Sequence, residues 1–238
     1  SGRGELHLSI LIENMRREGY ELGVSKPQVL MHKDSEGNLL EPIERVTVSC
    51  PEAYSGTVIN ELNLRKGLME SMEILDGDYV KIEFLVPTRG LLGYRSEFIN
   101  ATRGEGTLLS SFERFDDYKG EIPSRLNGVL VSQTAGKTMG YALNALSSRG
   151  ILFVDPAIDV YEGMIIGMNS RKEDMVVNPC KNKKMSNVRA SGSDDAIKLS
   201  PPKIFTLEES LEFIEDDELV EVTPDSIRLR KKILNEQD

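Results

Sequence analysis

The first apolar pattern in the chain predicts one amphipathic helix. Four apolar residues recur at the spacing of a single helix face: Leu8, Leu11, Ile12 and Met15. Gly19 ends this pattern, and residues 20 to 25 then alternate as a strand does. Because one helix and one strand cannot bury their own apolar faces, we expect residues 1 to 32 to be the C-terminal half of a truncated domain. Association of truncated chains through this segment is a further expectation.

The next pattern predicts a complete small domain after a polar linker at residues 33 to 42. Its expected elements, in order, are a strand at 43 to 50, a helix at 54 to 66, strands at 68 to 75 and 79 to 86, a helix at 91 to 102 and a strand at 107 to 115. In the third strand Val80, Ile82 and Phe84 share one face with Val86. The order βαββαβ is that of a ferredoxin-like domain, which we place at residues 43 to 119.

Residues 120 to 238 predict a mixed α/β domain that is rich in strands. We expect strands at 129 to 132, 151 to 154, 161 to 168, 218 to 222 and 226 to 233, and a helix at 137 to 148. Thr206 and Glu209 have the spacing of a capping box at the start of a second, short helix. Residues 170 to 195 lack apolar periodicity and predict a long loop, which in a compact domain is typical of a functional segment. The fold class of the whole chain is therefore α+β.

Composition is that of a globular protein, with 39% hydrophobic and 29% charged residues among 238. Two cysteines far apart, no leader peptide and no long apolar run favour a reduced, cytoplasmic protein that does not enter a membrane. The chain opens on Gly2-Arg3-Gly4 without an initiator Met, so we expect it to be a piece of a longer protein.

Charge is distributed unevenly along the chain. A formal net charge of −10 argues against a general nucleic-acid binder. Residues 171 to 189, however, hold six basic and two acidic residues, whereas residues 208 to 221 hold eight carboxylates and no base. Lysines and arginines on an extended loop can neutralise RNA phosphates, and neighbouring Asn and Ser side chains can reach 2′-hydroxyls. The alternative for this basic loop is a solvated surface segment.

Four other basic residues are weaker candidates for RNA contact. They flank predicted helices: Arg89, Arg103, Lys137 and Arg149. Capping and surface ion pairs explain such positions equally well.

Catalytic and metal sites are not predicted. Gly136-Lys137-Thr138 ends like a phosphate-binding loop, but Val131 stands where that motif needs glycine. His7 and His32, with two distant cysteines, do not supply the ligands of a structural zinc site. We therefore predict no catalytic residue, no metal site and no cofactor in this part of the protein.

Several strings resemble one family in the correct order. GRGELHL at residues 2 to 8 is similar to the end of the third domain of elongation factor G-like translational GTPases, and PEAYSG at 51 to 56 with LRKG at 64 to 67 is similar to their fifth domain. Three further strings resemble the BipA/TypA branch of these GTPases: PTRGLLGYR at 87 to 95, FDDY at 115 to 118 and SQTAGKTMGYAL at 132 to 143.

This resemblance implies a bacterial ribosome-binding GTPase that is linked to stress and cold adaptation and to assembly of the large subunit. Its implied partners are the 70S ribosome, large-subunit rRNA and the acceptor end of tRNA, bound by a functional monomer, while GTP and Mg²⁺ belong to a G domain outside this chain. The family's loop contacts fall here on Arg171, Lys172, Lys181, Asn182, Lys183, Lys184, Ser186 and Arg189.

Two other functions stay open at this point. One is a protein-interaction or small-ligand regulatory module without RNA contact, because the ferredoxin-like fold serves many roles. The other is a nucleotide hydrolase acting through Lys137 or Asp155, which the absent phosphate loop disfavours.

Overall fold

The computed structural model describes residues 5–122, 125, 127–181 and 199–235. The chain folds into two compact units, one of residues 27–124 and one that combines residues 1–26 with residues 125–238.

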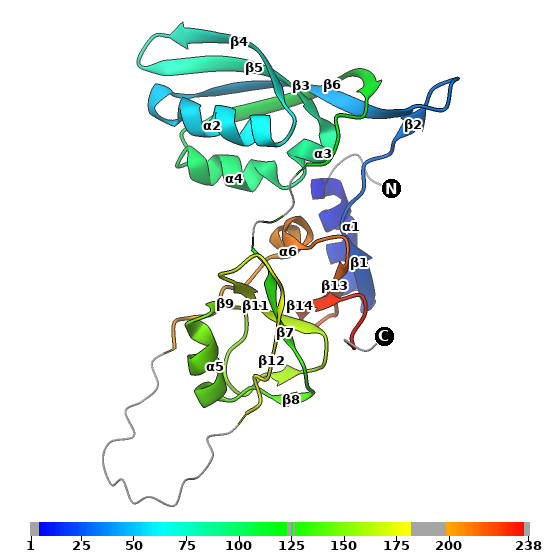
Figure 1. The fold of residues 1–238 in the computed structure, drawn as a ribbon, viewed down its shortest axis with the longest axis vertical. Coiled ribbons are helices and arrows are strands. Elements are labelled where there is room, and N and C mark those ends of the chain that lie inside the picture. The colour runs from blue at the N-terminus through cyan, green and yellow to red at the C-terminus, as the bar shows by residue number, and fades with distance from the viewer. Residues whose placement is uncertain (1–4, 123–124, 126, 182–198, 236–238) are drawn as a thin grey trace, which may run out of the picture. The chain divides into compact units, whose positions relative to one another are not determined.

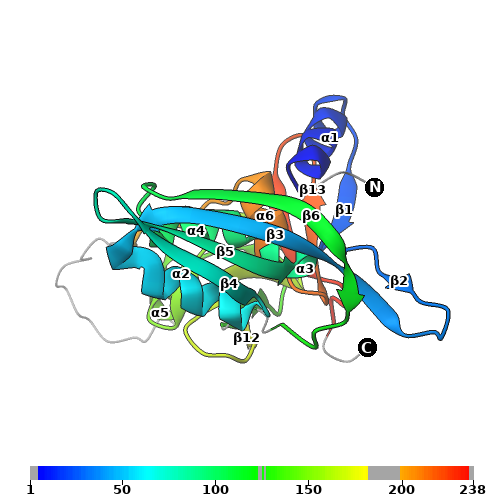
Figure 2. The ribbon, with the colours of Figure 1, turned by 90° about the horizontal axis from the view of Figure 1, so that it is seen from above.

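The unit of residues 27–124 has the predicted ferredoxin-like order. Its elements are β2 (His32–Lys33), β3 (Leu39–Pro51), α2 (Glu52–Leu64), β4 (Leu68–Leu75), β5 (Tyr79–Pro87), α3 (Thr88–Leu91), α4 (Tyr94–Ala101) and β6 (Thr107–Asp117). The sheet runs β2-β3-β5-β4, with β6 paired to the other edge of β3, and all these pairs are antiparallel. Figure 2 shows the long β3 strand crossing the sheet. The expected linker at 33 to 42 instead contains the end of β2 and the start of β3.

The core of this unit lies between the sheet and helices α2 and α4, which cover one sheet face (Figure 1). Val80, Ile82, Phe84 and Val86 are fully buried, as the alternation of β5 predicts. The long buried β5 strand therefore supplies the central apolar row of the domain.

The helix predicted at 91 to 102 is present as α4, and a separate short helix, α3, precedes it. Gly93 separates them with φ of 72°, a left-handed conformation that glycine adopts without a steric penalty. The Arg65 guanidinium donates to the carbonyls of Gly90 and Leu92, at 2.9 and 3.3 Å, and so satisfies the end of α3.

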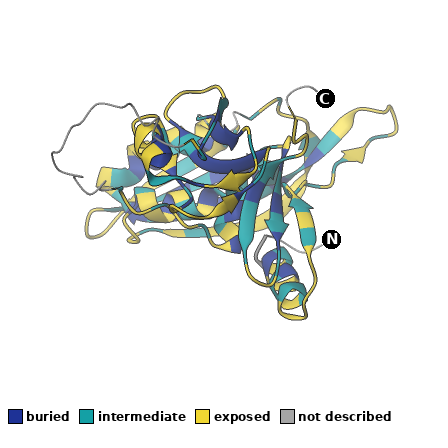
Figure 3. Ribbon diagram, turned by 90° about the horizontal axis from the view of Figure 1, so that it is seen from below, coloured by how far each residue is buried: buried dark blue, intermediate teal, exposed yellow. Residues whose placement is uncertain are grey.

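The second unit is built on a seven-stranded sheet. Its elements are α1 (Glu5–Arg17), β1 (Leu22–Ser25), β7 (Val129–Ser132), β8 (Gly136–Lys137), α5 (Gly140–Ser147), β9 (Gly150–Leu152), β10 (Asp159–Val160), β11 (Met164–Asn169), β12 (Met175–Val177), α6 (Leu207–Phe213), β13 (Glu218–Val222) and β14 (Ile227–Lys231). The sheet runs β1-β13-β14-β11-β7-β12, β9 pairs with β11, and β8 and β10 form a separate ribbon. Buried and half-buried residues alternate along β13. Figure 3 colours the ribbon by how far each described residue is buried.

The N-terminal segment belongs to this second unit. Strand β1 pairs with β13 from Leu22↔Val222 to Ser25↔Leu219, and α1 packs against α6. Ile12 of α1 joins the core cluster of Leu207 and Leu211. The structure thus divides the chain differently from the expected segments 1 to 32 and 120 to 238, because the apolar face of α1 is covered by the C-terminal part of the same chain.

Both junctions with the other unit meet at one carboxylate. The Lys26 ammonium lies 3.0 Å from one oxygen of Glu215, and the Arg125 backbone N–H donates to the other at 2.7 Å. The Arg125 guanidinium also binds buried Glu218 at 2.9 and 3.0 Å. The ferredoxin-like unit is therefore inserted between two neighbouring points of the second unit.

Two predictions about the C-terminal part are wrong. The helix expected at 137 to 148 begins at Gly140, and Lys137 instead lies in strand β8. The loop expected at 170 to 195 contains strand β12, which pairs in parallel with β7, and residues 182 to 195 lie outside the described residues. The Thr206–Glu209 capping box is confirmed.

Candidate nucleic-acid interface

Three of the eight primary RNA-contact candidates can be placed in the structure. Arg171 and Lys172 lie in the turn between β11 and β12, and Lys181 follows β12; all three are exposed. The other five candidates lie outside the described residues: Asn182, Lys183, Lys184, Ser186 and Arg189.

The turn that carries Arg171 and Lys172 is held by hydrogen bonds from buried groups. Asn169 is 2% exposed; its amide donates to the Glu173 carbonyl at 2.7 Å, and its side-chain oxygen accepts from the Arg171 N–H at 3.3 Å. The Gly128 N–H donates to the Arg171 carbonyl at 2.8 Å. A Cβ at Gly128 would lie 2.3 Å from the Glu173 backbone, so only glycine allows this close approach. The turn is therefore a rigid support for its two cations.

Arg149 lies beside this turn although it is distant in sequence. It follows α5, and its carbonyl accepts a hydrogen bond from the Ser170 N–H at 2.8 Å. Arg149 and Arg171 line one cavity of about 270 Å³. The complete lining is Ser148, Arg149, Asn169, Ser170, Arg171 and Met175.

One of the two carboxylates in this turn, Asp174, is already engaged. Asp174 lies 2.6 Å from the Lys231 ammonium and accepts the Val129 N–H at 2.8 Å. Burial lowers the Lys231 pKa, but hydrogen bonds from its ammonium to Asp174, Asp217 and Glu218 outweigh burial and raise that pKa above its usual value. Lys231 thus stays charged and engages Asp174, whereas Glu173 in the same turn is exposed.

Arg89, a secondary candidate, is bound within the ferredoxin-like unit. Its guanidinium donates to both oxygens of Glu41, at 2.5 and 3.2 Å, and to the Gly120 carbonyl. It also lies over the Tyr118 ring, 4.4 Å from the centroid. Glu41 is fully buried, so Arg89 balances a buried carboxylate, and its Nε and Nη2 donors are engaged within the unit.

The other two secondary candidates are exposed in different ways. Lys137 lies 3.6 Å from Asp159 in an exposed ion pair. Arg103 occupies the turn after α4 with φ of 52° and, within the described residues, has no ion-pair partner. Within the described residues, a shared cavity joins Arg149 to a primary candidate, Arg171.

The sequence did not predict Ser148, Asn169 and Ser170 as residues of this site. A local signal existed, since Ser-Arg recurs at 148–149 and 170–171, each time at the end of a predicted element. Nothing in the linear sequence pairs the two positions, because only the β9–β11 register brings Gly150 opposite Asn169.

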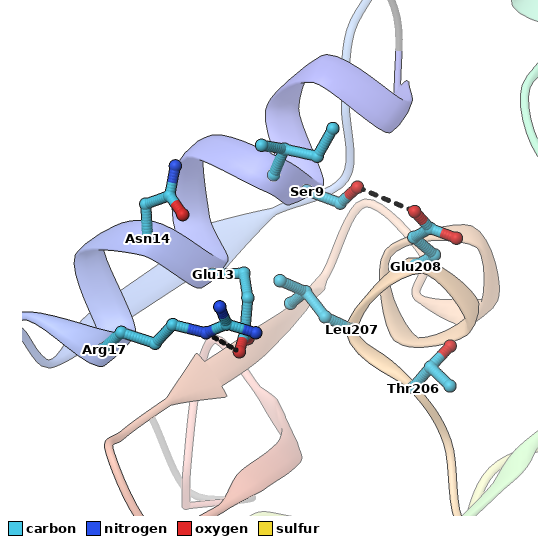
Figure 4. Close-up of a pocket in the computed structure, with 8 residues that line it drawn as sticks. Ser9, Glu13, Asn14, Arg17, Thr206, Leu207 and Glu208 are labelled. Carbon is cyan, nitrogen blue, oxygen red and sulfur yellow. Dashed lines mark hydrogen bonds and ion pairs between the residues drawn. The ribbon is translucent and has the colours of Figure 1, made fainter.

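A larger cavity of about 370 Å³ lies between α1 and α6. Figure 4 shows the Ser9 hydroxyl donating to Glu208, at 3.0 Å, and the Arg17–Glu13 pair on the helix. Two carboxylates and one arginine line this cavity, so it does not have the charge of an RNA-binding site.

Metal and membrane sites are not found in the described part of the chain. No group of three or more His, Cys, Asp or Glu residues there has metal-binding geometry. No described helix is long and apolar enough to cross a bilayer.

Comparison with known proteins identifies both units. Residues 127–236 match the family described as the TypA/BipA C-terminal domain, and residues 38–126 match the elongation factor G C-terminus. The whole chain is 54% identical to the "Large ribosomal subunit assembly factor BipA" of Haemophilus influenzae, 51% to that of Escherichia coli K12 and 48% to that of Bacillus subtilis 168. The chain belongs to the BipA/TypA family.

The chain spans 39% of the length of each of these BipA relatives and corresponds to their C-terminal part. Neither family match reaches residues 1–37. The structure nevertheless places α1 and β1 in the same unit as the BipA C-terminal domain, so this unit is larger than the stretch that the family match covers.

Proposed function

We propose that this chain is the ribosome-binding C-terminal part of a BipA-type translational GTPase. It contacts large-subunit rRNA and the acceptor end of tRNA through the basic segment of its C-terminal unit. The ferredoxin-like unit docks near the base of the large-subunit stalk. The relatives are named large ribosomal subunit assembly factors, which supports a role at the large subunit.

One observation carries the proposal. Arg149, Arg171 and Lys172 gather at the turn before β12 with no carboxylate partner in the described residues, in a chain whose net charge is −10. Uncompensated cations on a rigid turn of an acidic protein favour a local anionic partner. The remaining basic candidates follow this turn directly in sequence.

The other roles follow from the family and are part of the same proposal. The chain itself is non-catalytic, and a G domain outside it binds GTP with Mg²⁺ and hydrolyses GTP. The full protein acts in the bacterial cytoplasm as a monomer, in large-subunit assembly and in stress or cold adaptation.

The test removes positive charge from the basic segment of the full-length protein. We expect the variant Lys181→Ala/Lys183→Ala/Lys184→Ala to bind ribosomes at least tenfold more weakly and with a shallower salt dependence. The reason is that a variant with fewer phosphate contacts releases fewer counterions when it binds. Cosedimentation with ribosomes across a salt series measures both quantities.

The matched control removes three exposed cations elsewhere in the same unit: Arg17→Ala/Lys203→Ala/Lys232→Ala. It changes net charge equally and should leave binding within about twofold. Equal cosedimentation of the test variant and the wild type at every salt concentration would refute the RNA role of the segment. Partner capture that survives nuclease treatment would instead indicate a protein-interaction module.

A further inference from the structure

The cavity between the end of α5 and the turn before β12 has the composition of an anion site. Two guanidinium groups and two serines line it, from segments about twenty residues apart. An arginine has a planar fork of donors that matches two oxygens of one phosphate. The residues thus provide more donors than acceptors.

The two arginines lack strong partners of their own. Among the described residues, the side-chain acceptor of the Arg149 guanidinium is the Met175 sulfur, at 3.1 Å, and a thioether is a weak acceptor. No carboxylate of the described residues pairs with Arg149 or Arg171. An arginine without an anion partner beside a cavity leaves its donors available for a ligand.

The backbone around the cavity is fixed before any ligand arrives. A Cβ at Gly150 would lie 1.9 Å from the Met168 carbonyl oxygen, and one at Gly128 would lie 2.3 Å from the Glu173 carbonyl. The Ser170 N–H bond to the Arg149 carbonyl joins the two segments. Because the backbone is already ordered, binding an anion here costs little conformational entropy.

Size distinguishes between possible ligands. A cavity of about 270 Å³ is smaller than the roughly 300–1,000 Å³ of sites that enclose drug-sized ligands. It accommodates one phosphate group with bound water, while the rest of the ligand stays outside. A phosphate in a nucleic-acid strand satisfies this condition better than a free nucleotide, whose base and sugar would find no enclosed site.

We propose that Arg149 and Arg171 form a seat for a single phosphate group of an RNA strand, separate from the contacts of residues 181 to 189. This inference rests on the proposed RNA-binding function and specifies one point at which the strand is held. Arg149 and Arg171 bind the phosphate oxygens, and the Ser170 hydroxyl completes the site, whereas the Ser148 hydroxyl already donates to the Ala145 carbonyl at 3.0 Å.

The test compares the full chain with two pairs of variants. Arg149→Gln/Arg171→Gln should weaken binding of a single-stranded RNA oligonucleotide about tenfold or more and reduce the slope of log K against log salt by about 0.7, the value for one phosphate of a single strand. Arg149→Lys/Arg171→Lys keeps the two positive charges but lacks the planar, two-pronged guanidinium donors. It should recover only part of the RNA affinity. Full affinity in the lysine variant would overturn the seat, since net charge alone would then suffice.

A second measurement does not depend on RNA binding. Inorganic phosphate titrated into the wild-type chain should shift the Nε resonances of Arg149 and Arg171 by NMR, and leave that of Arg17 in place. If neither resonance moves, the seat does not exist. If both move but the glutamine variant binds RNA as the wild type does, the site takes a free phosphate and the RNA assignment is wrong.

The same experiments separate this inference from the wider proposal. A wild-type chain that binds neither RNA nor ribosomes contradicts the proposed function itself. A wild-type chain that binds, with a glutamine variant that binds equally well, contradicts only the seat. The control for charge is Arg17→Gln/Lys232→Gln, which removes two exposed cations from the same unit.

Discussion

At the scale of single residues, the same side chain serves different purposes in different surroundings. Arg89 lies at the start of α3 and Arg103 follows α4, and their sequence positions suggest similar surface roles. The structure binds Arg89 to buried Glu41 and leaves Arg103 exposed in a turn. Burial of the partner, which the sequence does not reveal, decides the difference.

This contrast predicts unequal effects on stability. Arg89→Ala should lower the free energy of unfolding of the ferredoxin-like unit by about 3 kcal/mol, because it leaves a buried carboxylate without its cation. Arg103→Ala is the control and should change that free energy by less than about 0.5 kcal/mol. Urea unfolding followed by circular dichroism measures both, and a stability of Arg89→Ala equal to that of the control would argue against the buried pair.

At the scale of elements, α1 shows where the apolar pattern succeeds and where it does not. The helix forms as predicted, but its buried face consists of Ser9 and Ile12, while Leu11 is 49% exposed. The face that turns inward is set by α6, whose Glu208 accepts the Ser9 hydroxyl. Periodicity alone predicted the helix, whereas packing against α6 determines which face of α1 is buried.

The element-scale prediction uses two neighbouring residues of α1. Ile12→Ala should destabilise the C-terminal unit by about 2 to 4 kcal/mol, since it opens a cavity in the core shared with Leu207 and Leu211. Leu11→Ala is the matched control and should cost less than about 1 kcal/mol. Hydrogen exchange of the β13 amides reports the effect, and unchanged protection in Ile12→Ala would mean that α1 is not part of this core.

At the scale of the whole molecule, one unit is inserted into the other. Lys26 and Arg125 share the carboxylate of Glu215, so the two connections leave the C-terminal unit side by side. When the two connections of an inserted domain leave its host side by side, the inserted domain can be removed and the host can still fold.

We therefore expect residues 1–26 joined by a short Gly-Ser linker to residues 125–238 to fold as a stable protein. Residues 125–238 alone should be less stable or insoluble, because β13 loses its partner β1 and α6 loses its cover α1. Thermal unfolding and gel filtration of the two proteins test this. Equal stability of both would show that residues 1–26 contribute nothing to the unit.

Local patterns in the sequence determined most of the secondary structure. Alternation in β5, the capping box of α6 and the βαββαβ order depend on near neighbours, and the structure agrees with each. The cluster of positive charge after β11 was also visible, because charge is a property of the residues themselves.

Only the tertiary structure decided which distant segments meet. The pairing of β1 with β13, the insertion of residues 27–124 and the approach of Arg149 to Arg171 all join residues that are far apart in sequence. The same reason explains Arg89, whose role depends on Glu41 in another strand. Periodicity records how a segment presents its own side chains, but the partner that covers them is set by long-range packing and strand register, which no local pattern contains.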